Sequence, residues 1–284
     1  MIYISTHFSN YSNIINPISK LAQSGFNNIE LTGGTNYYNK LEADLINIKS
    51  ELNLNFQLHN YFPPPKEHFV FNLASLDKNI NQSSIEHAKN AIALSRKLNS
   101  YRMAFHAGFF IHIGHKEIGK QITNREFYNE NEAIDKFVES LKQLTNFAGN
   151  DFKIYIENNV VSENNIASFN GKNPAMLTDY QSYLDLKEKI DFNILLDIAH
   201  LKVSAKSLGL NFNEQVKKLI DFTDYIHISD NNGLEDQNRS FEENSSLFNL
   251  LKNIKFNNKI VTLEIFGSIN KIKESYDNLL KVQS

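Results

Sequence analysis

Histidine and acidic residues recur at the ends of short apolar runs along this chain. Six consecutive runs each carry a residue that can bind a metal or transfer a proton, namely His59, His106, Glu157, Asp197, His227 and Glu264. Singly, a histidine beside an apolar run is more often a core or loop residue, and an acidic residue that closes a strand is often a helix cap. Gathered in one place, the carboxylates would repel each other and lose hydration, at a cost that a bound cation removes. Carboxylate and imidazole together suit zinc, manganese or iron, so the pattern predicts a divalent metal site.

The elements that must bring these residues together alternate between short and long segments. The short apolar runs predict strands over residues 2–5, 28–31, 55–59, 102–106, 153–157, 193–197, 225–229 and 259–264. The longer segments have apolar residues at three- and four-residue spacing, which predicts helices over residues 16–24, 41–52, 84–99, 131–149, 178–190, 213–222, 241–253 and 269–282. Two polar stretches, 83–86 and 178–181, look like capped helix starts.

Strands that alternate with helices pair in parallel through right-handed crossovers. About eight such units in 284 residues predict a (β/α)8 TIM barrel, with residues 1–284 forming a single domain. An open doubly wound sheet is the alternative, but the stretch after the first strand, residues 6–10, is not a glycine-rich phosphate loop. In a barrel, the carboxyl ends of all strands meet at one face, where catalytic sites are built. The six metal-binding candidates are therefore expected at the same face.

Composition narrows the classes of function. The chain has no cysteine, which excludes disulfides, thiolate zinc sites and thiol catalysis. A formal net charge of -3 and the lack of a basic stripe disfavour a nucleic-acid partner. No apolar run reaches the roughly 18 residues of a membrane span, and the first residues do not resemble a signal peptide. We therefore expect a cytoplasmic protein with no membrane partner.

The order of these strand-end residues resembles the xylose-isomerase-like TIM barrel superfamily, which includes sugar (phosphate) isomerases and epimerases and abasic-site nucleases of the endonuclease IV type. The resemblance covers nearly the whole chain. In the epimerase branch, one metal is held by Glu, Asp, His and Glu from strands five to eight, and those positions here are Glu157, Asp197, His227 and Glu264. The resemblance implies that both glutamates also transfer protons, while the metal stabilises a cis-enediolate. It further implies that His200 contacts the substrate.

The nuclease branch uses three zinc ions and adds other ligands. This chain has the matching His59, His106 and His200, but it has Asp236-Gln237-Asn238 where that pattern has Asp-x-His. Asparagine is a poor zinc ligand, so this departure weakens the nuclease interpretation. His59 and His106 are open to two roles, binding a second metal or donating hydrogen bonds to a sugar.

The substrate side of the site is less well defined by the sequence. The candidates there are His7, His200, Asp236, Asn238 and Arg239, of which Arg239 replaces an arginine that relatives carry closer to the strand-seven histidine. The resemblance implies zinc or manganese as the ion, with cobalt or magnesium as alternatives. Dimers and tetramers are common among the relatives, which makes a homo-oligomer an expectation here.

These observations lead to one main hypothesis and two alternatives. The main hypothesis is a divalent-metal-dependent isomerase or epimerase of a small sugar, polyol or sugar phosphate. The first alternative is an endonuclease IV-like zinc phosphodiesterase that cuts abasic-site DNA. The second is a metal-binding barrel that has been recruited to a non-isomerase biosynthetic or binding role.

Overall fold

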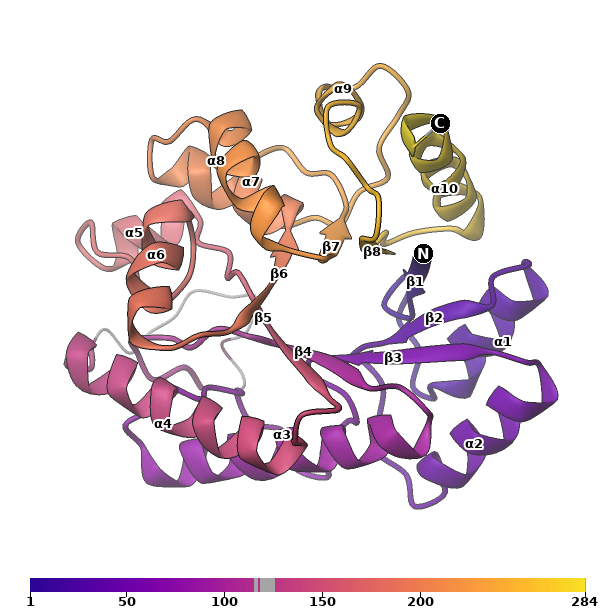
Figure 1. The fold of residues 1–284 in the computed structure, drawn as a ribbon, viewed down its shortest axis with the longest axis horizontal. Coiled ribbons are helices and arrows are strands. Elements are labelled where there is room, and N and C mark those ends of the chain that lie inside the picture. Colours follow the sequence, from indigo (N-terminus) through magenta and orange to yellow (C-terminus); the bar gives the residue numbers. More distant parts are fainter. Residues whose placement is uncertain (115–116, 118–125, 284) are drawn as a thin grey trace.

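Eight parallel strands form a closed barrel in chain order (Figure 1). The structure, a computed structural model, describes residues 1–114, 117 and 126–283. The strands are β1 (Ile2–Ser5), β2 (Asn28–Leu31), β3 (Asn55–His59), β4 (Arg102–His106), β5 (Lys153–Glu157), β6 (Asn193–Asp197), β7 (Tyr225–Ile228) and β8 (Ile260–Leu263). Pairing of β1 with β8 closes the barrel. The prediction of a (β/α)8 barrel is confirmed.

Helices surround the strands on the outside of the barrel, as Figure 1 shows. They are α1 (Ile15–Gln23), α2 (Leu41–Glu51), α3 (Lys78–Lys97), α4 (Glu130–Ala148), α5 (Glu163–Ser168), α6 (Tyr180–Lys189), α7 (Ile198–Ser207), α8 (Phe212–Leu219), the 3-10 turn η2 (Ile220–Phe222), α9 (Ser246–Leu251) and α10 (Ile269–Gln283). Among the described residues, no helix has the length and apolarity needed to cross a membrane.

Several helices differ from the sequence-based expectation: α5 was not predicted, and the helix expected at 241–253 is confined to α9. The predicted start of a helix at 83–86 is wrong, because α3 begins at Lys78, where the Asp77 side chain accepts hydrogen bonds from the backbone N–H groups of Asn79 and Ile80. Helix α7 was not predicted, since it follows β6 with no loop between them. Its N-cap is Asp197, which is also the last residue of β6. The start expected at 178–181 is confirmed, with Asp179 capping α6.

The interior of the barrel is packed below the level of the strand ends. Ala104, Tyr155, Leu195 and Tyr225 form a buried cluster of their own. The rings of Tyr155 and Tyr225 meet edge to face, with centroids 5.2 Å apart. A second, larger core lies in the layer between strands and helices. Because side chains fill the barrel floor, a ligand can reach the strand-end residues only from the carboxyl end, which we call the mouth of the barrel.

A buried histidine on α3 adds a pH-sensitive element to the outer layer. The His87 ring stacks on Tyr61 with centroids 5.0 Å apart, and it meets the edges of Phe69 and Phe71. Its Nε2 is buried without a hydrogen-bond partner among the described residues. Burial lowers the pKa of His87 to about 4, so the folded protein holds this ring neutral.

This histidine makes stability depend on pH. As the pH falls from about 6.5 to about 4, the unfolded chain takes up a proton that folded His87 does not, so stability present above pH 6.5 is lost. We expect the wild type to lose about 2–3 kcal/mol more than His87→Phe between pH 7.5 and pH 4.5 in urea unfolding. The exposed neighbour His68 provides the control, since His68→Gln should follow the wild type. Equal losses in wild type and His87→Phe would contradict the assignment.

Candidate metal centre

The residues predicted to bind a metal meet at the mouth of the barrel. His59, His106, Glu157 and Asp197 each end a strand, His227 lies within β7, and Glu264 directly follows β8. The sheet register pairs His106 with Glu157 and Asp197 with His227. Because parallel strands in register place paired residues at one height, side chains that are far apart in sequence become neighbours.

One nitrogen lies at the centre of the predicted ligand quartet. The Nδ1 atom of His227 is 3.4 Å from Oε1 of Glu157, 3.9 Å from Oδ2 of Asp197 and 3.5 Å from Oε2 of Glu264. Atoms that bind one ion at bond lengths of about 2.0–2.2 Å lie about 3–4 Å from one another. Ligand atoms of Glu157, Asp197 and His227 all lie within 4.8 Å of one another and could hold one ion, while Glu264 belongs with Glu30, His59 and His227 to another such group. The two groups share His227, whose Nδ1 faces all three carboxylates of the quartet.

Glu157 also faces a second group of donors. Its Oε2 lies 2.7 Å from Nε2 of His59 and 3.0 Å from Nδ1 of His106. These three residues form a separate set close enough to hold an ion. The two oxygens of Glu157 thus point to different sets, Oε1 to the quartet and Oε2 to the two histidines.

The unpaired atoms of the quartet show that its residues fit a metal. Oε1 of Glu157, Oδ2 of Asp197 and Nδ1 of His227 are buried without a hydrogen-bond partner in the described part of the chain. Buried polar atoms of this kind are costly unless something satisfies them. A divalent cation would satisfy all three at once, and carboxylate and imidazole donors suit zinc or manganese.

Electrostatics at the site lead to the same conclusion. Burial raises the pKa of Asp197 to about 7; the nearby His200 opposes this rise, and the Glu157 carboxylate adds to it. Burial also disfavours ionised Glu157, but the imidazoles of His106 and His59 hold its pKa well below the usual range. A cation among these groups would favour the ionised form of both carboxylates.

Asp197 serves the helix and the site together. Its Oδ1 accepts a hydrogen bond of 2.6 Å from the backbone N–H of His200 and so caps α7, while Oδ2 faces the quartet. Asn158, which follows β5, holds the backbone of Asp197 through two hydrogen bonds of 2.8 and 3.0 Å. The backbone carbonyl of Asn158 also accepts a hydrogen bond of 2.9 Å from Nδ1 of His200. Asn158, at the end of β5, thereby positions both Asp197 at the end of β6 and His200 on α7.

The residues that were predicted to bind substrate differ in what they contact. The loop after β7 brings Oδ2 of Asp236 to 3.3 Å from Nε2 of His200. Oδ1 of Asn238 accepts a hydrogen bond of 3.0 Å from the Ser229 hydroxyl within the same loop region. Arg239 is exposed, and its backbone pairs with Asp230.

The remaining substrate candidate lies near the first strand. His7 is exposed after β1, and its ring meets the edge of Phe266, with centroids 5.8 Å apart. Contact with substrate stays a prediction for His7, as it does for Asn238 and Arg239.

The sequence did not single out Glu30, which lies beneath the quartet. This residue of β2 is fully buried, and its Oε1 is 3.0 Å from Nε2 of His227. The signal was present in the strand itself, because Glu30 stands between the apolar residues Ile29 and Leu31. Strand alternation directs it to the opposite face from both neighbours, into the barrel, where a charged group requires a partner.

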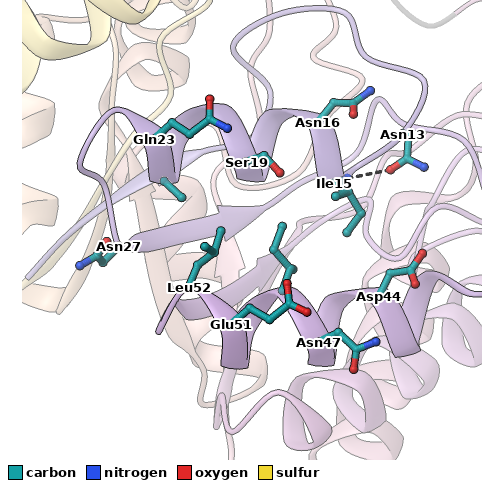
Figure 2. Close-up of a pocket in the computed structure, with 12 residues that line it drawn as sticks. Asn13, Ile15, Asn16, Ser19, Gln23, Asn27, Asp44, Asn47, Glu51 and Leu52 are labelled. Carbon is teal, nitrogen blue, oxygen red and sulfur yellow. Dashed lines mark hydrogen bonds between the residues drawn. The ribbon is translucent and has the colours of Figure 1, made fainter.

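A cavity lies away from these residues, on the outer wall of the barrel. It has a volume of about 770 Å³ between α1 and α2 (Figure 2). Amide and acidic side chains from both helices line it, among them Asn16, Gln23, Asn47 and Glu51. None of the strand-end residues belongs to it, so the candidate metal centre rests on its donor atoms and not on this cavity.

Comparison with known proteins places the chain in a family. A family model described as xylose isomerase-like TIM barrel matches residues 18–282.

Solved structures of similar fold include sugar epimerases. A solved D-tagatose 3-epimerase-like protein is similar with a TM-score of 0.73 and 19% identity, over 99% of this chain and 96% of that one. The D-psicose 3-epimerase of Clostridium cellulolyticum H10 has a TM-score of 0.67 and 12% identity, over 100% and 99%. A 3-keto-D-glucoside 4-epimerase from E. coli has a TM-score of 0.63 and 11% identity, over 99% and 98%. At these identities the similarity shows a shared fold. No curated protein matches the chain.

The role of Asn158 in holding the site can be measured as stability. Asn158→Ala removes both buried hydrogen bonds to the backbone of Asp197. Since this leaves an N–H and a carbonyl unsatisfied, we expect the free energy of unfolding to fall by about 1–3 kcal/mol in urea denaturation. Asn47→Ala on the exposed side of α2 is the matched control and should change little. A similar small change in both variants would refute the role given to Asn158.

Proposed function

Because the chain belongs to the xylose isomerase-like TIM barrel family, we propose that it is a divalent-metal-dependent isomerase or epimerase of a small sugar, polyol or sugar phosphate. The observation that carries this proposal is the convergence of three carboxylate oxygens on Nδ1 of His227 at the barrel mouth. Structures of the same fold that are described as sugar epimerases support a carbohydrate substrate.

In this proposal, Glu157, Asp197, His227 and Glu264 hold the ion. A divalent ion there, zinc or manganese before cobalt or magnesium, would polarise carbonyl and hydroxyl oxygens of a sugar and so stabilise negative charge on it. The remaining chemistry, which is proton transfer at carbon, falls to side chains of the protein.

Glu157 and Glu264 are the proton-transfer groups. They stand at the ends of β5 and β8, three strands apart in the barrel, so they approach a bound sugar from different sides. One removes the proton from the carbon next to the carbonyl, and the other works on the opposite face of that carbon. Burial raises the pKa of Glu264, but His227 outweighs this and holds it at about 2. The carboxylate is therefore ionised at neutral pH, as a base must be.

His200 orients the substrate. Burial disfavours its charged form, but the carboxylates of Asp197 and Asp236 raise the pKa of His200 well above its usual value. The protonated ring donates from Nδ1 to the carbonyl of Asn158 and directs Nε2 toward Asp236. In this proposal, a sugar hydroxyl replaces Asp236 as the acceptor of the Nε2–H hydrogen bond.

Conservative substitution of the two glutamates tests their roles. Glu157→Gln and Glu264→Gln should each slow incorporation of solvent deuterium at the substrate carbon by at least about 100-fold, because acid–base catalysis typically contributes 10² or more. Circular dichroism should show an intact fold. The exposed Glu163→Gln on α5 serves as the control and should exchange at the wild-type rate. Wild-type exchange in both site variants would eliminate these roles.

Metal content separates the proposal from the nuclease alternative. The donor set of His59, His106 and Oε2 of Glu157 supports a second, weaker ion beside that of the quartet. We expect elemental analysis after saturation with zinc to give two ions per chain, and His106→Ala to give one. A single ion in the wild type would instead assign His59 and His106 to the substrate.

Three zinc ions with cutting of abasic duplex DNA would favour the nuclease. The carboxylate of Asp236 beside His200 is available for a third ion, but Asn238 is engaged with Ser229 and offers no strong donor. Tight metal binding without turnover of any sugar in a broad panel would favour the accessory role.

A further inference from the structure

We propose that Glu30 is a positioning residue that holds His227 in the tautomer and ring orientation whose Nδ1 binds the divalent ion. The inference rests on the metal centre of the proposed function. It extends that centre to the layer of side chains beneath it.

The two nitrogens of His227 face different surroundings. Nδ1 faces the carboxylates of the quartet, while Nε2 lies 3.0 Å from Oε1 and 3.3 Å from Oε2 of Glu30. A neutral imidazole has one N–H and one lone pair. A carboxylate accepts but cannot donate, so Glu30 fixes the N–H on Nε2 and leaves the lone pair on Nδ1 for the ion.

Glu30 is itself held in place from three other strands. Its Oε2 accepts hydrogen bonds from Nε2 of Gln57 at 2.8 Å, from Oγ1 of Thr262 at 2.8 Å and from the Tyr225 hydroxyl. These donors come from β3, β8 and β7, and all are buried. The carboxylate is thus fixed before any ion arrives, and the His227 ring is fixed with it.

A role in filling the barrel does not explain this charge. Removing an ionised carboxylate from water costs several kcal/mol, and a neutral side chain of similar volume would fill the space without that cost. Its hydrogen-bonding partners are three neutral groups and His227. The charge of Glu30 also acts on His59, but the imidazole in direct contact with it is that of His227, which becomes a stronger ligand when a carboxylate accepts its other N–H.

The test compares metal affinity in matched variants by calorimetry with Mn²⁺ and Zn²⁺. Glu30→Gln preserves size but removes the charge, and we expect it to weaken binding about 10- to 100-fold. Thr262→Val removes one support of Glu30 and keeps its charge; it should weaken binding in the same direction by less, and it provides the test if Glu30→Gln does not fold. The control is Thr223→Val, whose hydroxyl bonds only backbone groups of Ile194 and Tyr225 among the described residues, so it should lower stability and leave affinity unchanged.

A second measurement follows the tautomer directly. In the zinc-loaded protein with ¹⁵N-labelled histidine, the Nε2–H proton of His227 should give a downfield NMR signal, and Glu30→Gln should shift it upfield. Thr223→Val should leave it in place.

The outcomes distinguish the two proposals. Wild-type protein that binds neither ion would overturn the proposed function and this inference together. Wild-type binding with undiminished affinity in Glu30→Gln and Thr262→Val would overturn the role of Glu30 and leave the proposed function standing.

Discussion

The arrangement of this site depends on how buried negative charge is stabilised at one end of the barrel. Glu157 and Asp197 are fully buried, and Glu264 is nearly so. Carboxylates this close repel each other, and burial removes the water that would screen them. The described groups that offset this charge are imidazoles, with His227 at the centre. Among the described residues, Nδ1 of His227 and two carboxylate oxygens remain without a hydrogen-bond partner. A divalent cation is the simplest group that completes such an arrangement.

The fold makes this arrangement rigid. Each ligand belongs to a strand or follows one directly, so backbone hydrogen bonds to both neighbouring strands fix its position. The aromatic pair Tyr155 and Tyr225 closes the barrel floor beneath the site. Sites on strands of a packed barrel keep their geometry better than sites on loops, which suits a reaction in which proton donor and acceptor must be placed accurately.

Several side chains combine a structural and a chemical role. Asp197 caps α7 with one oxygen and faces the quartet with the other. Glu157 is likewise shared, since its two oxygens face two donor sets. A helix-cap explanation and a ligand explanation of one acidic residue are therefore compatible. Because one side chain has both roles, its replacement is expected to affect local structure as well as metal binding.

The sequence by itself determined the barrel and the polar residues that gather at its mouth. Strand period, helix period and their alternation are local properties, so the strands were predicted almost to the residue. The polar residues that end them gave six candidates, and the family resemblance implied the quartet among these. The shift of α3 to Lys78 and the presence of α7 depended on the Asp77 and Asp197 caps, which such periodicity does not show.

Only the tertiary structure showed which atoms meet. It brought Glu30 under His227, divided the two oxygens of Glu157 between two donor sets, and joined Asp236 to His200. These contacts link residues as far apart as 197 positions. They follow from barrel closure and side-chain rotamers, which no local pattern in the chain encodes.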